Sequence, residues 1–279
     1  METSRILVAA GAVGLLAAAG CGSSNSTAAA QPAKTSTVPA SQAVQLAARQ
    51  SQAETSLAAT VRVSAQGSTA VSSSGTVQEQ TKPALFVNAD MSSVTVNGQA
   101  LPGGIKEILT PSTLYLQLSE LSEMTGKQWV KLPFSELSGL TGGVNVGQLL
   151  QQASTSEPTF QTEFLAGASN VRTVGTGVID GVPVTEYTGT ISMATALRRI
   201  PAADRSQVSQ DIAKTGIKSA DFTVWLDTQH RVRKLIMKEK GSSITETTTV
   251  QVTSIGQPVN TQLPSASQTA TVPVSDLKS

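Results

Sequence analysis

The sequence has one cysteine and one histidine in 279 residues, and this scarcity excludes several kinds of chemistry. A zinc site built from cysteine and histidine side chains needs more ligands than the chain has. A Ser-His-Asp triad would have to use His230, which lies in the sequence Asp227-Thr228-Gln229-His230-Arg231, a pattern typical of a hairpin turn. We therefore expect His230 to be a turn residue, and we expect no catalytic residue, no metal and no cofactor.

The chain also has almost no net charge and few aromatic residues. Twenty basic and nineteen acidic side chains give a net charge of +1 at pH 7, so no strong positive field attracts nucleic acid. Aromatic residues make up only 3% of the chain, so the core must be built from Val, Leu, Ile and Ala. These smaller side chains fill less space, and the composition therefore permits a hollow interior.

The N-terminal segment has the regions of a secretory signal peptide in their usual order. A short segment with Arg5 precedes the apolar run 6–16, and the small residues 17–20 then lead to Cys21. The apolar run is shorter than the roughly 20 residues that a membrane-spanning helix needs. We expect residues 1–20 to be a signal peptide that is removed.

The end of this segment, Leu16-Ala17-Ala18-Ala19-Gly20-Cys21, resembles the bacterial lipobox, in which the cysteine is lipidated and becomes the new N-terminus. It departs from the usual pattern at Ala18, where Leu is preferred. Cys21 has no disulfide partner, and an unpaired thiol is a liability in an oxidising compartment. Because stable anchoring takes two acyl chains, a diacylglyceryl group on Cys21 would suffice. We expect a cell-membrane lipoprotein that faces the extracytoplasmic side, in the periplasm or cell-wall space.

The rest of the chain divides into a tether, one domain and a tail. Residues 22–40 are small and polar, with two prolines and no apolar pattern, so 21–40 should be the lipidated cysteine and a flexible tether. We expect residues 41–264 to form one folded domain. Residues 265–279 are mostly polar and should form a loose tail.

Apolar and polar residues alternate through much of the domain, which indicates strands with one buried face. Parallel strands are covered on both faces, so this pattern favours an antiparallel sheet. Turn sequences such as Asn97-Gly98 and Asp180-Gly181 separate the strands. The alternating segments are 61–63, 85–91, 94–96, 114–118, 130–132 and 220–226.

Three segments have helical character. Ser41 can cap a helix that runs to about Ala59, and apolar spacing predicts further helices within 134–167 and within 192–216. A sheet with one polar face must cover the other face, and these helices are the available cover. The predicted fold class is therefore α+β.

Two groups of residues allow alternative interpretations. Trp129, Trp225, Tyr115 and Tyr187 are predicted on strand faces opposite the main apolar alternation, where they line a ligand groove or, more commonly, lie half-covered by a loop. The basic run 231–240 is either a set of edge-strand lysines that prevents association of sheets or a site for a lipid phosphate, and we favour the edge strand.

Several segments together resemble the LppX/LprG group of actinobacterial lipoproteins. Besides the lipobox, they are Leu114-Tyr115-Leu116, residues 126–131, residues 222–227 leading into 232–235, and residues 256–259. The resemblance implies a strongly curved antiparallel sheet, a half-barrel wrapped around helices, as in the LolA and LolB lipoprotein carriers. It also implies an apolar cavity between sheet and helices that holds the acyl chains of a lipid or glycolipid. A membrane lipid exporter is then a candidate partner, and we expect a monomer.

A second function of a different class stays open, namely a non-enzymatic cell-surface interaction or sensory lipoprotein that uses the same fold without a lipid ligand. If a cavity exists, residues 137–150 could form its lid, because they combine Leu and Val with four glycines that weaken a helix. The alternative is a loop that covers the core and never moves. The candidate cavity residues are Leu137, Leu140, Val144, Leu149, Leu150, Phe222 and Val224.

Overall fold

The computed structural model describes residues 38–134, 162, 164–198, 205, 209–210, 212–213 and 215–271. The predicted signal peptide, Cys21 and most of the tether lie outside these residues. So does the predicted lid at 137–150.

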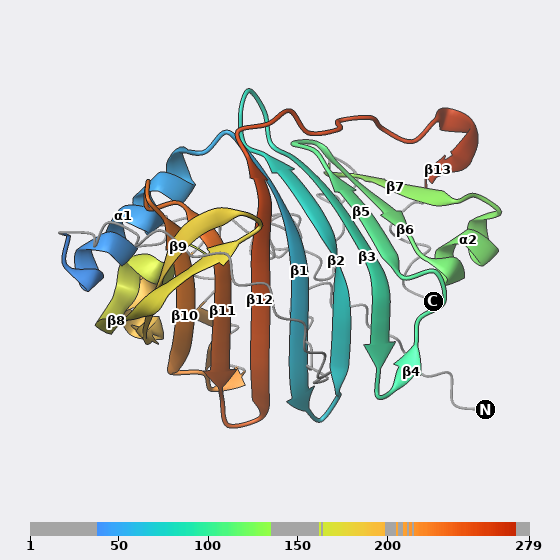
Figure 1. The fold of residues 1–279 in the computed structure, drawn as a ribbon. Coiled ribbons are helices and arrows are strands. Elements are labelled where there is room, and N and C mark those ends of the chain that lie inside the picture. Colours follow the sequence, from blue (N-terminus) through green and yellow to red (C-terminus); the bar gives the residue numbers. More distant parts are fainter. Residues whose placement is uncertain are drawn as a thin grey trace, which may run out of the picture.

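The described residues form a single strongly curved sheet that wraps around a helix (Figure 1). The strand order is β13-β7-β6-β5-β3-β2-β1-β12-β11-β10-β9-β8, with β4 beside β3. Neighbouring strands are antiparallel except β13 and β7, which are parallel. The strands are β1 (Ser56–Gly67), β2 (Val71–Gln80), β3 (Phe86–Val96), β4 (Gln99–Ala100), β5 (Ile105–Leu109), β6 (Thr113–Gln117), β7 (Trp129–Pro133), β8 (Ala168–Ile179), β9 (Val182–Ser192), β10 (Ser219–Asp227), β11 (Val232–Lys240), β12 (Ile244–Ile255) and β13 (Thr269–Thr271).

Several helices have both ends within the described residues. They are α1 (Ala40–Ala53), α2 (Ser119–Thr125), α6 (Met193–Leu197) and the 3-10 turns η1 (Phe164–Gly167) and η2 (Ala266–Gln268). In this part of the chain no helix has the length and apolarity needed to cross a membrane. The predicted α+β fold class, with a curved antiparallel half-barrel around a helix, is confirmed.

The first helix is shorter than the sequence predicts. It ends at Ala53, because the backbone of Glu54 turns to an extended conformation and β1 begins at Ser56. Ser41 is not the cap either, since the helix begins after Pro39, whose carbonyl accepts hydrogen bonds from the N–H groups of Gln42 and Ala43. Leu57 is buried from a strand and not from the helix.

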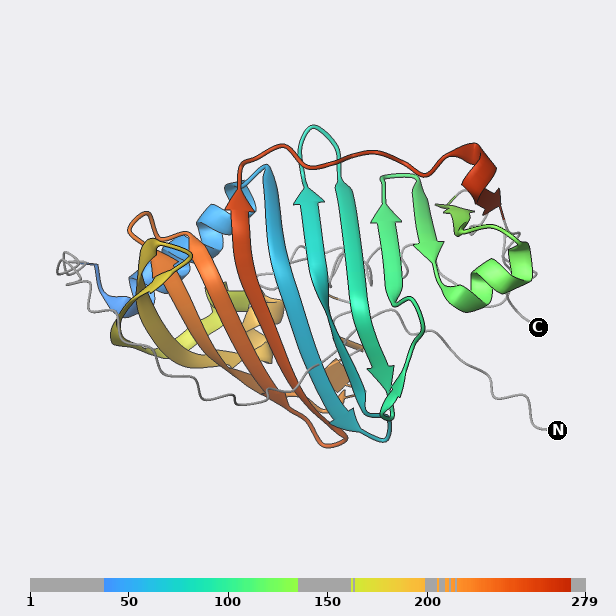
Figure 2. The same cartoon turned by 45° about the vertical axis from the view of Figure 1, so that its right-hand side comes forward.

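We call the side of the sheet that α1 packs against the concave face, and the other side the convex face. Figures 1 and 2 both place α1 behind the half of the sheet that contains β8 to β12. Its apolar stripe consists of Ala43, Val44, Ala47 and Ala48, all buried in the main apolar cluster. Small alanines let the helix approach the strands closely.

The other helical predictions are only partly inside the described residues. Of segment 134–167, residues 164–167 form the 3-10 turn η1, and of segment 192–216, the helix α6 occupies its beginning. The predicted turns are confirmed, because Asn97, Gly98, Asp180, Gly181 and His230 all have positive φ between neighbouring strands.

The predicted loose tail after Pro264 is wrong for its first part. Residues 256–265 run along one end of the strands from β12 toward β7 (Figure 2), and β13 then pairs with β7 at the sheet's edge. The Lys127 ammonium donates a hydrogen bond to the Ser267 carbonyl, at 3.0 Å. We call residues 256–271 the C-terminal strap. Three residues are too few to show a period-2 pattern, so the sequence carries no sign of this strand.

Candidate functional site

Residues opposite each other on neighbouring strands point to the same face of the sheet. In the α1 half of the sheet, the residues that point to the concave face are mainly apolar. One continuous row crosses five strands, from β9 to β1. Every member is buried, and the row packs in the cluster that contains α1. The row consists of Tyr187, Val224, Leu235, Val250 and, beyond that cluster, Val61.

Two further rows continue the apolar face across the other half of the sheet, from β2 to β7. The row of Val87, Leu109, Leu114 and Leu132 begins at Glu79, and all five side chains are buried. The second row is Val77, Ala89, Glu107, Leu116 and Val130. Among the described helices, none lies across this half of the sheet in Figure 1, and α2 lies beyond it at the β7 edge. The concave face therefore extends well past α1.

Besides Glu79, three glutamates interrupt this apolar face. Glu107 lies in the middle of its row, and burial raises its pKa from 4.5 to about 7. Glu239 and Glu246 lie opposite each other on β11 and β12. Burial, and then the charge of Glu246, raise the pKa of Glu239 from 4.5 to about 7, and burial also raises the pKa of Glu246. Sequence reasoning missed these three, although each follows the alternation of its own strand.

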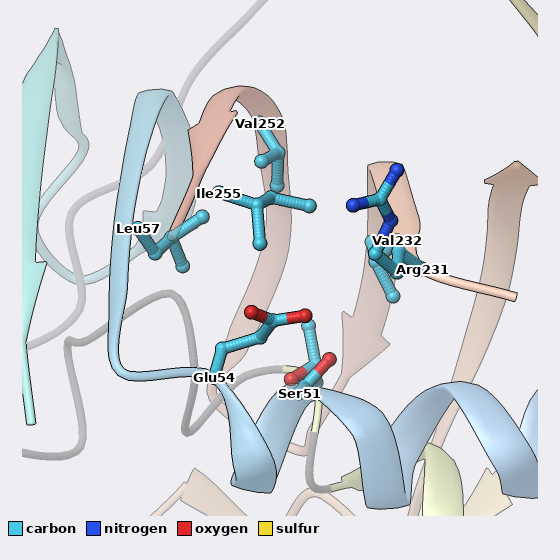
Figure 3. Close-up of a pocket in the computed structure, with 8 residues that line it drawn as sticks. Ser51, Glu54, Leu57, Arg231, Val232, Val252 and Ile255 are labelled. Carbon is cyan, nitrogen blue, oxygen red and sulfur yellow. The ribbon is translucent and has the colours of Figure 1, made fainter. Parts of the chain in front are cut away.

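A small pocket lies where the end of α1 meets the sheet (Figure 3). Ser51 and Glu54 line it from the helix side, and Leu57, Val252 and Ile255 line it from β1 and β12. Its volume of about 20 Å³ suits about one water molecule and not an acyl chain. A second hollow of about 280 Å³ opens beside the start of α2 and has a mixed polar and apolar lining.

Only two of the predicted cavity residues, Phe222 and Val224, are among the residues that the structure describes. Phe222 and Val224 lie on the concave face and are fully buried in the cluster that contains α1. The Phe222 ring crosses β9 over Gly189, where a Cβ atom would come within 2.8 Å of the ring. Their contact with a ligand stays a prediction. Leu137, Leu140, Val144, Leu149, Leu150 and Cys21 lie outside the described residues.

The predicted placement of the aromatic residues holds for three of four. Trp225 lies on the convex face, with the Lys234 ammonium 5.2 Å from its ring centre. Tyr115 and Trp129 belong to a convex-face cluster with Phe86 and Ile108. Tyr187 was predicted on the same side, and that is wrong: it is 2% exposed and packs among the apolar residues of the concave face.

The edge-strand explanation for the basic run 231–240 is also wrong. These residues form β11, which pairs with β10 on one side and β12 on the other, so it is an interior strand. Arg231 and Arg233 bind the buried carboxylate of Asp227, at 2.9 and 3.0 Å. Lys238 and Lys240 are exposed to solvent. Part of the positive charge is therefore structural.

His230 is the turn residue that the sequence predicts. It has a φ of 58° between β10 and β11, and its N–H donates to the Asp227 carbonyl. In the described part of the chain no three His, Cys, Asp or Glu side chains gather closely enough to hold a metal ion.

The fold and the site together define a class: an open, strongly curved antiparallel sheet whose concave face is apolar and packs on one long helix. No family model matches the chain. An uncharacterized 31.2 kDa protein of Streptomyces griseus is 25% identical over 147 residues, which are 52% of this chain and 48% of that protein. The chain therefore spans about half the length of the curated relative it matches.

Similar solved structures include two mycobacterial lipoproteins. Lipoprotein LppX of Mycobacterium tuberculosis is 20% identical, with a TM-score of 0.45 over 80% of this chain and 97% of that one. LprF of Mycobacterium bovis is 15% identical, with a TM-score of 0.48 over 81% of this chain and 97% of that one. A LolA superfamily protein of Nitrosomonas europaea is 11% identical, with a TM-score of 0.27 over 81% and 96%. LppX is of the group that the sequence resembles.

Proposed function

We propose that this protein is a membrane-anchored extracytoplasmic lipoprotein that carries a lipid or glycolipid, with the acyl chains against the concave face of its sheet. The observation that carries the proposal is the continuity of the apolar rows, which extend from β9 through β1 to β7. The half of this face beyond α1 is built mainly from Val, Leu and Ala, with Glu79 and Glu107 among them. Acyl chains gain roughly 25 cal/mol for each Å² of apolar surface that they remove from water there.

The membrane anchor in this proposal is the lipid on Cys21, and the tether joins it to the domain. The lipobox-like sequence and the absence of a second cysteine support this part of the proposal. A flexible coil of some 19 residues reaches roughly 25 Å, so the concave face could approach the membrane and return. No catalytic step is required of any residue.

Native mass spectrometry tests the proposal. The mature chain with Cys21→Ser, made in an actinobacterial host, should keep an acyl lipid that organic solvent extracts. Ala89 lies partly buried on the concave face beside Val77 and Glu107, so Ala89→Phe should fill space there and lower the amount of bound lipid several-fold. The matched control is Asn88→Phe, one residue away on the convex face of the same strand.

Circular dichroism would establish that both phenylalanine variants are folded. Protein without any acyl lipid from such a host would contradict carriage and favour the interaction or sensory lipoprotein. Equal lipid in the two folded phenylalanine variants would contradict the proposed location of the acyl chains.

A further inference from the structure

Two carboxylic acids face each other across neighbouring strands at one end of the concave face. Glu239 of β11 is directly opposite Glu246 of β12, so their Cβ atoms are roughly 5 Å apart. The next residues along the same row are Ala220 of β10 and Ala65 of β1, and both are buried. The pair therefore lies between small apolar side chains, on the same face as the apolar rows.

The surroundings of this pair offer little that would stabilise two negative charges. The Thr248 hydroxyl donates one hydrogen bond to Oε1 of Glu246, at 3.2 Å. Within the described residues neither carboxylate has an ion-pair partner. Lys238 and Lys240, which flank Glu239 in sequence, are exposed, and so is Lys218 just before β10. β10 and β1 contribute only the two alanines to this row.

Physical chemistry then favours a single shared proton. Two like charges directly opposite each other on adjacent strands repel, and burial of a charge without a partner is costly. If one of the two carboxyl groups is protonated, its O–H can donate to the other group, and one negative charge disappears. The same pair thus has a stable form with one proton and a strained form with none.

The strained form would act at a definite place in the fold. The pair is next to the turn between β11 and β12, where the Gly241 N–H donates to the Ile244 carbonyl and the Ser242 N–H donates to the Thr215 carbonyl. Ile217 and Met237, beside the pair, belong to the apolar cluster that contains α1. Repulsion between the carboxylates would separate β11 from β12 there and admit water to the end of the cluster.

We propose that Glu239 and Glu246 share one proton and that its loss loosens the β11–β12 end of the concave face, so that an apolar ligand is retained at lower pH and released at higher pH. The release step rests on the lipid-carrier function proposed above, whereas the shared proton and the loosening do not. The pKa of Glu239 in the folded protein (about 7) lies above its ordinary value of 4.5. The contribution of this protonated group to the stability of the folded protein is therefore complete below pH 4.5 and is lost as pH rises through 7.

NMR titration of carbon-13 labelled glutamate carboxyl groups tests the shared proton in the mature chain with Cys21→Ser. Glu246→Gln removes the neighbouring charge but keeps an oxygen for the Thr248 hydroxyl, so the pKa of Glu239 should fall measurably toward 4.5. The control is Glu186→Gln on the convex face of β9, which should leave the titration of Glu239 unchanged. If Glu246→Gln leaves it unchanged as well, the shared proton is excluded.

Hydrogen exchange tests the loosening without any lipid. Amides of β11 and β12 near the turn should exchange several-fold faster at about 1.5 pH units above 7 than at the same interval below it, after correction for the intrinsic pH dependence of exchange. The double variant Glu239→Gln/Glu246→Gln should lose this difference. A difference that is absent from the wild type, or that persists in the double variant, overturns the loosening.

Transfer of an uncharged pyrene-labelled diacylglycerol from phosphatidylcholine vesicles tests the release step. The wild type should retain less probe above pH 7 than below it, and the double variant should retain equal amounts. Equal pH dependence in both proteins overturns the link to release. Absence of the probe at every pH contradicts lipid carriage instead, while the titration and the exchange measurements still decide the pair.

Discussion

At the scale of single residues, Asp227 organises the turn between β10 and β11. Its carboxylate accepts hydrogen bonds from the N–H groups of Gln229 and Arg231 and from the guanidinium groups of Arg231 and Arg233. Burial by itself would raise the pKa of Asp227, but these donors outweigh it and hold the pKa below its ordinary value of 3.8. One acidic residue thus fixes the direction in which the chain enters β11.

Removal of this carboxylate should strongly destabilise the protein. Asp227→Ala leaves two guanidinium groups and two N–H groups without their acceptor, and we expect a loss of about 3 kcal/mol in urea unfolding at pH 7. The matched control is Asp221→Ala, an exposed position on the same strand, with an expected effect below about 0.5 kcal/mol. Because the pKa is lowered, the difference between wild type and Asp227→Ala should shrink as pH falls below 3.8. Equal stability of the two alanine variants at pH 7 would contradict this role.

The glutamates of the concave face show what residue patterns can and cannot predict. Glu239 follows Leu235 and Met237 at intervals of two, and Glu246 precedes Thr248 and Val250 at intervals of two, so the period alone places both on the buried face. The register in which β11 pairs with β12 brings Glu239 and Glu246 together. The hairpin that joins these two strands is short, so this pairing could have been predicted from the sequence. The signal in the sequence for these buried carboxyl groups was a glutamate at a position where the alternation predicts an apolar residue.

At the scale of elements, the C-terminal strap holds the β7 edge of the sheet. Val259 packs on the convex-face cluster of Phe86, Ile108 and Tyr115, and β13 supplies a parallel neighbour for β7. The N–H of Asn260 also donates to the side chain of Gln78, at 3.4 Å. Residues 269–271, which belong to the tail expected to be loose, therefore cover an edge strand that would otherwise expose unpaired backbone groups.

Deletion of residues 265–279 should loosen this edge alone. The backbone groups of Trp129 to Lys131 lose their partners on β13, so the β7 amides should exchange several-fold faster, while those of β10 to β12 stay protected. The control is deletion of residues 272–279, which keeps β13. Hydrogen exchange with mass spectrometry distinguishes the two. Unchanged protection of β7 in the longer deletion would show that the strap does not hold the edge.

The elements that the sequence mispredicts share a physical reason. The helical propensity of residues 41–53 continues through Leu57 to Ala59, and only the pairing of these residues with β12 makes them a strand. The basic run looks like an edge strand until β10 and β12 are placed on either side of it. The alternation of apolar and polar residues in a strand is a local property of the sequence. Which strands lie beside it depends on how the whole sheet is assembled.

At the scale of the whole molecule, the sheet follows from strands with one apolar face and from the turns between them. Both features could be predicted from the sequence. The order of the strands in the sheet could not be predicted, because β1 pairs with β12 across nearly 200 residues of sequence. That pairing joins the α1 half of the concave face to the β2–β7 half through Val61 and Val63. The apolar face is therefore continuous, and a ligand position could not be derived from any one segment.

The location of the molecule should depend on one atom, the sulfur of Cys21. Two acyl chains on a diacylglyceryl cysteine hold a protein on a membrane stably, whereas one chain holds it only marginally and serine accepts none by this route. In the expressing bacterium, Cys21→Ser should therefore replace the lipidated form by an aqueous-phase or uncleaved product in detergent partitioning, and mass spectrometry should show the loss of the lipid. Ser23→Ala, in the same tether, is the matched control and should partition like the wild type. Equal membrane retention of a processed Cys21→Ser protein would contradict the anchor.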